Sequence, residues 1–169
     1  MSVRDARPDD AHAIATVHVE TWRAAYAHAL PADFLASLAT EPRETAWRQE
    51  IESGSDVVVA EQDGRVIGFA SVGPARGEEG AGELYAIYVL PSAWGTGAGR
   101  ELMAAAVARL RERGHEQATL WVLEDNPRAR RFYEAGGWRL DGGRTSDTIG
   151  GVDAVQVRYR LVLSGHGRA

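Results

Sequence analysis

Hydrophobic and polar residues follow two different periods along the chain, and each period predicts a different kind of element. Between residues 14 and 51 the apolar side chains recur at a roughly helical spacing. Short apolar runs bounded by turn residues predict strands instead. Asp63-Gly64 lies between two such runs and predicts a hairpin turn. The run at residues 83–90 is apolar almost throughout, which is typical of a strand buried on both faces.

The predicted elements follow the order β-α-α-α-β-β-β-α-β-α-β-β. Strands are expected over residues 2–6, 56–62, 65–72, 83–90, 117–123, 138–140 and 154–163. Helices are expected to begin at Pro8, Pro31 and Pro42, and later to span residues 100–113 and 127–135. Residues 73–82 and 141–151 are expected to be polar loops, the second rich in glycine. This order predicts an α/β fold in which helices cover both faces of a mixed sheet.

The composition is that of an ordinary soluble protein. With 169 residues, 44% apolar and 25% charged, we expect one globular domain over residues 1–163 and a disordered tail at residues 164–169. No apolar run approaches the ~18 residues of a membrane span, and the N-terminus lacks the apolar region of a signal peptide, so a cytoplasmic protein is expected. All 19 basic residues are arginine, which, with abundant alanine and glycine, suggests a GC-rich bacterial genome.

Charge and residue content exclude several classes of function. The net charge of −5 argues against broad nucleic-acid binding and favours a cationic acceptor. The chain has no cysteine, which excludes disulfides, a thiolate nucleophile and a cysteine-ligated zinc. Its five histidines form no pair at metal-binding spacing, so we expect no metal and place them on helix surfaces and in the tail.

The stretch Trp94-Gly95-Thr96-Gly97-Ala98-Gly99-Arg100 follows the strand expected at residues 83–90 and opens the next helix. Glycine lets the backbone approach a ligand closely, and the first N–H groups of a helix are free to bind an anion. The stretch therefore predicts a phosphate site, with a plain glycine-rich turn as the alternative. It fits neither a Walker A loop nor the G-x-G-x-x-G of a dinucleotide fold. A ligand with a pyrophosphate, other than NAD or a P-loop nucleotide, is expected.

Two motifs at their correct separation resemble the GCN5-related N-acetyltransferase (GNAT) superfamily. The family's loop pattern Gln/Arg-x-x-Gly-x-Gly/Ala falls on residues 94–99, and its later pattern Asn-x-x-Ala-x-x-Phe-Tyr-x-x-x-Gly-Phe/Trp is matched at every fixed position from Asn126 to Trp138. Trp94 stands where the family usually has Gln or Arg, so backbone N–H groups are expected to do most of the phosphate binding. The resemblance implies a GNAT-type fold whose central strands splay apart and admit the pantetheine arm of acetyl-CoA.

The resemblance further implies transfer of an acetyl group from acetyl-CoA to a primary amine by direct attack, without a metal. It implies that acetyl-CoA, the acyl-donor substrate, binds at Ile87, Tyr88, Val89, Trp94, Gly95, Thr96, Gly97, Ala98, Gly99, Arg100, Asn126 and Arg130. Plainer alternatives stay open for three of these residues. Arg100 and Arg130 could be solvated helix residues, and Asn126 could serve only as a helix cap.

Glu83 and Tyr133 are the catalytic candidates that the resemblance implies. Neutralising a lysine-like amine at pH 7 costs roughly 4.6 kcal/mol, so a base, or a water that leads to one, eases the attack. By the two-residue period of a strand, Glu83 shares a face with residues 85, 87 and 89, and it is the candidate base. Its alternative is an exposed glutamate at the start of a strand. Tyr133 is expected to protonate the leaving thiolate, with a packed aromatic ring as its alternative.

The acceptor side is implied to lie against the first two helices, with Trp22, Tyr26 and Phe34 as candidate lining residues. Aromatic faces can bind a cation, although aromatic residues at helical spacing also form cores. The expected partner is a small-molecule or peptide amine, with no nucleic acid and no membrane, and a homodimer stays open. Two rival functions remain. One is transfer from another acyl-CoA such as succinyl-CoA, which an arginine at the acceptor end would indicate. The other is a CoA-binding sensor without turnover.

Overall fold

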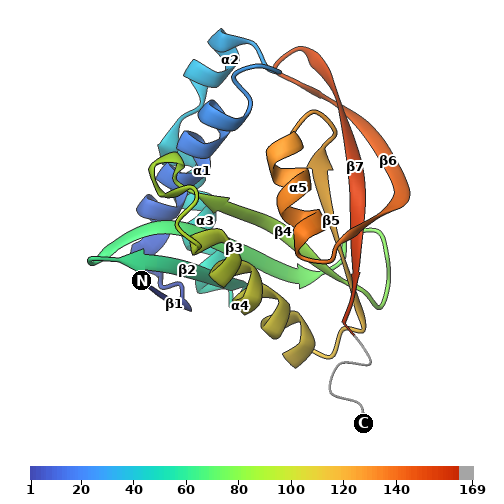
Figure 1. Cartoon of the computed structure of the whole chain (residues 1–169). Helices are drawn as coiled ribbons and strands as arrows, with labels where there is room; N and C mark the ends of the chain where they lie inside the picture. The colour runs from blue at the N-terminus through green and yellow to red at the C-terminus, as the bar shows by residue number, and fades with distance from the viewer. Residues whose placement is uncertain (164–169) are drawn as a thin grey trace.

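A computed structural model describes residues 1–163, and these residues form one mixed sheet of seven strands with helices on both faces (Figure 1). The strand order is β1-β2-β3-β4-β5-β7-β6, and β4 and β5 are the parallel neighbours in it. The tail predicted at residues 164–169 lies outside the described residues. The prediction of an α/β fold with a mixed sheet is confirmed.

The elements follow the predicted order. The strands are β1 Ser2–Asp5, β2 Asp56–Gln62, β3 Arg65–Pro74, β4 Gly82–Val89, β5 Gln117–Leu123, β6 Arg139–Ile149 and β7 Val152–Val162. The helices are α1 Ala11–Ala25, α2 Ala32–Ser37, α3 Thr40–Glu52, α4 Ala98–Glu112 and α5 Pro127–Ala135, with short 3₁₀ turns at Pro8–Asp10 and Pro91–Ala93. In the described part of the chain, no helix combines the length and the apolar character needed to cross a membrane.

Side chains that alternate along β3 show which helices cover which face of the sheet. The ring centroid of Phe69 lies 5.0 Å from that of Trp47 on α3 and 6.3 Å from that of His18 on α1. The neighbouring Gly68 faces the other way, since a Cβ there would come within 3.0 Å of Leu102 on α4. Because successive strand residues point to opposite faces, α1 and α3 cover one face and α4 covers the other.

The two central strands, β4 and β5, pair only near their first residues. Their register joins Gly82 to Ala118 and Glu83 to Thr119, and no later pair follows within the described strands. Beyond this point the two strands diverge (Figure 1). The predicted splay of the sheet is confirmed, and Glu83 lies at its vertex.

A β-bulge in β4 changes the direction of the side chains next to Glu83. The register of β4 with β3 shifts at Tyr85, which is left without a partner on β3. After the shift, Ile87 and Val89 point to the face of α4. Before it, Glu83 points to the opposite face, which α1 covers. The expectation that Glu83 shares a face with residues 87 and 89 is therefore wrong, because a simple two-residue period does not survive a bulge.

The polar stretch at residues 141–151 belongs to a long hairpin rather than to the predicted loop. Strands β6 and β7 have 11 residues each, and they turn at Gly150 and Gly151, which have φ of 58° and 82°. Most of β6 is exposed, so its sequence lacks the apolar alternation of a half-buried strand. Hydrogen bonds to β7, rather than burial of its side chains, hold this segment as a strand.

His18 packs among aromatic rings instead of lying on a helix surface as predicted. Its ring stacks on Tyr88 with 5.3 Å between centroids, and its Nδ1 lies 3.4 Å from the donor Nε1 of Trp47. Burial, with a smaller effect from Arg43, lowers the pKa of His18 to about 4. The neutral imidazole is therefore the form that the folded protein stabilises.

Folding stability should consequently fall as the pH drops from 6.5 to about 4. In that window the unfolded chain binds a proton at His18 more readily than the folded one, so the free energy of unfolding should decrease by about 3 kcal/mol. Urea unfolding of wild type and His18→Gln at pH 7 and pH ~4.5 checks this. The variant should lack this part of the decline, and an equal decline in both proteins would contradict the assignment.

Candidate active site

A cavity of about 910 Å³ opens between the diverging parts of β4 and β5. Its walls come from α1, β4, the glycine stretch, β5 and α5, with Ile149 and Gln156 of the β6–β7 hairpin on one side. Glu83 and Tyr133, the two catalytic candidates, both line it. Residues that are far apart in the sequence are thus brought to one cavity, together with the predicted phosphate site.

The glycine stretch has the geometry of an anion site. Gly95 and Gly97 have φ of 79° and 93°, a left-handed conformation that favours glycine, and Gly97 is the N-cap of α4. Within residues 1–163, the N–H groups of Gly95, Gly97, Gly99 and Arg100 donate to no main-chain carbonyl. They stand at the positive end of the α4 dipole, which is where a phosphate is stabilised.

Trp94 and Arg128 meet beside this stretch. The guanidinium carbon of Arg128 lies 3.8 Å from the centroid of the Trp94 ring, and Trp94 Nε1 donates to the carbonyl of Val89 at 2.8 Å. Burial, followed by the nearby charge of Arg131, lowers the pKa of Arg128, and no carboxylate in the described residues counters this. A guanidinium without an acidic partner is therefore held on the indole face at the edge of the anion site.

Most of the predicted cofactor residues line the cavity. They are Ile87, Tyr88, Val89, Trp94, Gly95, Gly97, Gly99, Arg100 and Asn126. Thr96 and Ala98 are not among them, since the Thr96 hydroxyl donates to the carbonyl of Ala93 at 2.6 Å and so closes the turn instead.

Arg130 is held away from the cavity. It donates to Tyr159 Oη at 3.0 Å and to the carbonyl of Glu124 at 3.1 Å, and it is absent from the cavity lining. The structure therefore does not bring Arg130 to the site where we predicted it, and Arg128 of the same helix lies there. The sequence offered no way to choose between them, because both fall in the basic run of α5.

Asn126 acts as a helix cap and also holds a cavity residue. Its Oδ1 accepts a hydrogen bond from the N–H of Ala129 at 3.2 Å, as the capping alternative predicted. Its Nδ2 donates to Tyr26 Oη at 3.3 Å, which ties α5 to the end of α1. One N–H of this amide remains for a ligand.

Glu83 carries a buried carboxylate, with only 1% of the residue exposed, so the alternative of an exposed glutamate at a strand start is wrong. Its Oε1 accepts from the backbone N–H of Arg76 at 2.9 Å, and its Oε2 accepts from Arg76 Nη2 at 2.7 Å. This bond raises the pKa of the Arg76 guanidinium. Arg76 also lines the cavity, and we missed it because it lies in a polar loop without a motif.

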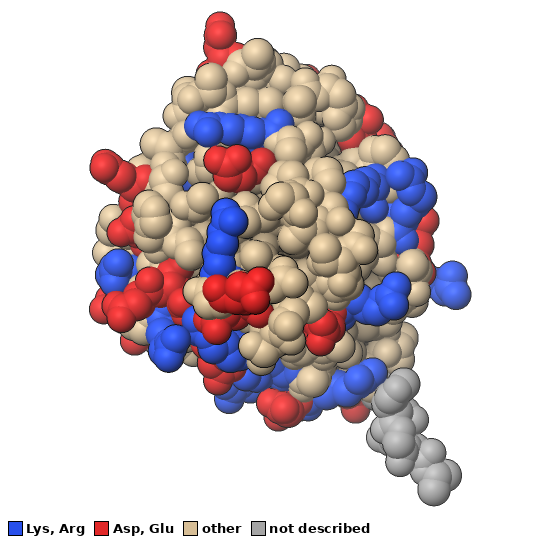
Figure 2. Space-filling view, turned by 60° about the vertical axis from the view of Figure 1, so that its left-hand side comes forward, with Lys and Arg blue, Asp and Glu red and all other residues tan. Residues whose placement is uncertain are grey.

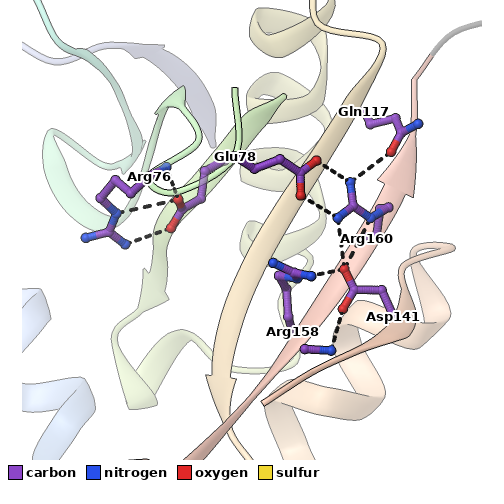
Figure 3. A network of polar contacts seen from close by, with 8 residues as sticks. Arg76, Glu78, Gln117, Asp141, Arg158 and Arg160 are labelled. Carbon is purple, nitrogen blue, oxygen red and sulfur yellow. Dashed lines mark hydrogen bonds and ion pairs between the residues drawn. The ribbon is translucent and has the colours of Figure 1, made fainter. Parts of the chain in front are cut away.

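A network of ion pairs anchors the loop between β3 and β4 that carries Arg76 (Figure 3). Glu78, in the same loop, accepts two hydrogen bonds from Arg160 of β7, at 2.7 and 2.8 Å. Arg160 also donates to Gln117 of β5 at 2.8 Å and to Asp141 of β6 at 3.2 Å. These contacts tie the loop to the sheet on the side away from Arg76.

Tyr133 lines the cavity from α5. The residue is 8% exposed, and its ring packs against Phe132 at 5.7 Å and Tyr159 at 6.1 Å between centroids. Burial, followed by Tyr88 and Tyr26, raises the pKa of Tyr133, so the phenol stays protonated at neutral pH. The ring thus packs as the alternative predicted, while the hydroxyl keeps the proton that an acid requires.

Two of the three predicted acceptor residues line the cavity. Trp22 Nε1 donates to Tyr88 Oη at 3.2 Å, and the rings of Trp22 and Tyr26 meet edge to face at 4.8 Å. Phe34 is not part of the lining. Its ring packs on Gly150, where a Cβ would come within 2.6 Å of it, because α2 directs it toward the β6–β7 turn.

Positive groups outnumber negative ones in the cavity wall. Arg76, Arg100 and Arg128 line it, and Glu83 is the one carboxylate in the described residues that does so. On the outer face in Figure 2, acidic and basic side chains are interspersed without a continuous patch of one sign. The net charge of the chain favours a cationic acceptor, whereas the positive charge of the cavity wall does not. The described residues hold no group of three histidine or acidic side chains that could bind a metal.

Known proteins of similar sequence and fold belong to one family. The model of the acetyltransferase (GNAT) family matches residues 13–138. The chain is 40% identical over 137 residues to YuaI of Bacillus subtilis, named an uncharacterized N-acetyltransferase, with 80% of this chain and 78% of that protein covered. An N-acetyltransferase structure from Staphylococcus aureus Mu50 has a TM-score of 0.76 at 20% identity and covers 96% of this chain and 98% of its own. A putative acetyltransferase from Salmonella typhimurium, yncA, solved with acetyl-CoA, has a TM-score of 0.75 at 23% identity over 100% and 97% of the two chains.

The fold and the match over most of the chain define the class: the chain belongs to the GNAT acetyltransferase family. It is an N-acetyltransferase that depends on acetyl-CoA. The resemblance read from the two motifs is confirmed.

Proposed function

We propose that the protein transfers the acetyl group of acetyl-CoA directly to a primary amine in the cavity between β4 and β5. The observation that carries this proposal is that Glu83 and Tyr133 line the same cavity as the glycine stretch. When the pyrophosphate binds at the start of α4, the rest of the cofactor lies between the diverging strands β4 and β5. The backbone of residues 87–89 does not pair with β5. The pantetheine amides can therefore bind along it in the manner of an added half-strand.

The residues divide the chemistry between them. The amine nitrogen attacks the thioester carbonyl, and Glu83, directly or through a water, takes the proton that the nitrogen loses as the N–C bond forms. When the C–S bond breaks, Tyr133 gives its proton to the leaving sulfur. The products are the N-acetylated amine and CoA, and proton exchange with solvent restores both side chains. No covalent enzyme intermediate is needed.

The phosphates are proposed to bind the N–H groups of Gly95, Gly97, Gly99 and Arg100, with Arg128 as an additional cation. Each charge-assisted bond of this kind contributes on the order of 1.5–3 kcal/mol. Arg128 suits the role because it lacks an acidic partner in the described residues and is fixed on Trp94. A guanidinium therefore stands next to the position where the family usually places Gln or Arg.

Gly97→Glu should abolish measurable CoA binding, because it puts bulk and negative charge where the pyrophosphate is expected. The φ of 93° at this residue makes any side chain strained, so Gly97→Ala is the matched control for strain alone. Calorimetry with CoA on both variants, beside melting temperatures, separates the two effects. A folded Gly97→Glu protein with the CoA affinity of Gly97→Ala would show that the phosphates bind elsewhere.

Two rival functions are tested by product analysis. Arg76 is an arginine in the cavity next to Glu83, which is the feature that transfer from succinyl-CoA would need. A CoA-binding sensor without turnover is disfavoured by the presence of Glu83 and Tyr133 in one cavity. Mass spectrometry of an amine panel incubated with acetyl-CoA or succinyl-CoA distinguishes all three. A cytoplasmic location, one domain over residues 1–163 and a homodimer stay predictions.

A further inference from the structure

We propose that Arg76 binds a carboxylate of the acceptor, so that the acceptor is an amino-acid-type amine with an apolar or aromatic body. This inference rests on the proposed transfer to an amine and narrows its substrate class. Four observations carry it: the charge of the cavity wall, the free face of Arg76, the contact between Arg76 and Glu83, and the aromatic lining.

The charge of the wall disfavours a polycation. The one lining carboxylate in the described residues, that of Glu83, is already paired with Arg76. A second ammonium group on a substrate would therefore meet Arg76 without a free acid to receive it, and like charges repel. A substrate whose own carboxylate accompanies its amine brings no net positive charge into the cavity.

Arg76 keeps hydrogen-bond donors free for a ligand while its contacts with Glu83 and Tyr85 position its guanidinium group. Its backbone N–H, its Nη2 and, at 3.5 Å, its Nε donate to Glu83, whereas its Nη1 donates to no group within residues 1–163. Its side chain is 71% exposed, and its guanidinium carbon lies 5.0 Å from the centroid of the Tyr85 ring. The loop around it is anchored through Glu78 to Arg160. A planar guanidinium fixed in this way is suited to recognise a carboxylate.

The contact with Glu83 sets the distance between the two substrate groups. Arg76 Nη2 and Glu83 Oε2 are 2.7 Å apart, so an amine that gives its proton directly to Glu83 has its neighbouring atoms close to Arg76. In an α-amino acid the carboxyl carbon is two bonds from the amine nitrogen, which matches this adjacency. The same cavity is lined by aromatic residues, which can contact the apolar part of the substrate: Trp22, Tyr26 and Trp121.

Matched pairs of acceptors test the inference. With acetyl-CoA as donor, kcat/KM is measured for phenylalanine against phenethylamine and for tryptophan against tryptamine, corrected for the neutral fraction of each amine. Wild type should prefer the amino acid by roughly 10-fold or more. Arg76→Gln should reduce that preference to about threefold or less, and Arg76→Lys should lie between. Because each preference compares two substrates of one protein, a general loss of activity in a variant cancels.

The control is Arg144→Gln, an arginine of β6 that pairs with Glu124 outside the cavity lining, and it should keep the wild-type preference. Equal use of both members of each pair by wild type, or an unchanged preference in Arg76→Gln, would overturn the inference while leaving acetyl transfer intact. A wild-type preference for succinyl-CoA over acetyl-CoA that Arg76→Gln removes would assign the carboxylate to the donor and also overturn it. Absence of transfer to every amine, with CoA still bound, would instead reject the proposed function.

Discussion

Replacing Tyr133 by Phe should lower kcat by about 10²–10⁴-fold and leave the KM for acetyl-CoA near its wild-type value. The substitution removes the hydroxyl that we propose protonates the leaving thiolate, and it keeps the ring that packs against Phe132 and Tyr159. Because burial raises the pKa of Tyr133, the wild-type rate should show no decline from its ionisation between pH 7 and about 10. Steady-state kinetics of both proteins, with single-turnover measurements of the chemical step, check this.

Tyr159→Phe is the matched control for Tyr133→Phe. Tyr159 is a neighbouring tyrosine whose hydroxyl contacts Arg130 and Glu134 and which does not line the cavity. Its loss should affect melting temperature more than kcat. If the two variants had the same kcat, or if Tyr133→Phe kept the wild-type rate when chemistry is limiting, Tyr133 would have no part in proton transfer.

Glu83→Gln should lower kcat at neutral pH by a similar factor, about 10²–10⁴-fold, while CoA still binds. The loss should shrink as the pH rises toward the pKa of the amine, because solution then supplies more of the neutral nucleophile. The structure adds a second effect, since the new amide would face Arg76 Nη2 at the present distance of 2.7 Å and lower the stability. Melting temperature alone therefore cannot identify a base, and the pH–rate profile is the deciding measurement.

Glu78→Gln separates these two effects. Glu78 is a glutamate of the neighbouring loop that pairs with Arg160 and does not line the cavity. Its substitution should shift the rate, if at all, by one constant factor at every pH. Profiles of Glu83→Gln and wild type that run parallel across the pH range would remove Glu83 as the base and leave it a structural partner of Arg76.

The elements near the motifs were predictable because their signals are local. The apolar run of β5 and the pair Asn126-Pro127 that opens α5 predicted bounds identical to those observed. Glycine permits the left-handed φ that Gly95 and Gly97 adopt, but it does not impose it. Strand β6 was not predictable in this way, because its side chains are mostly exposed and its identity depends on hydrogen bonds to β7.

The details of the site depended on contacts between distant parts of the chain. The bulge at Tyr85 is a property of the pairing of β4 with β3, and it turns Glu83 away from the face of Ile87. The choice of Arg128 over Arg130 follows from which side of α5 meets Trp94. Neither the register of β4 with β3 nor the contact between Arg128 and Trp94 can be predicted from the order of residues.

The sequence by itself determined the family and the acetyl donor, and it supplied the phosphate site and the two proton-transfer residues that we propose, because each rests on residue types at fixed spacings. Only the tertiary structure decided the surroundings of those residues. It buried Glu83, placed Arg76 against it and left the cavity wall with more positive than negative groups. The physical reason is that burial and charge pairing depend on which surfaces the chain brings together in space, and these surfaces come from segments without a common motif.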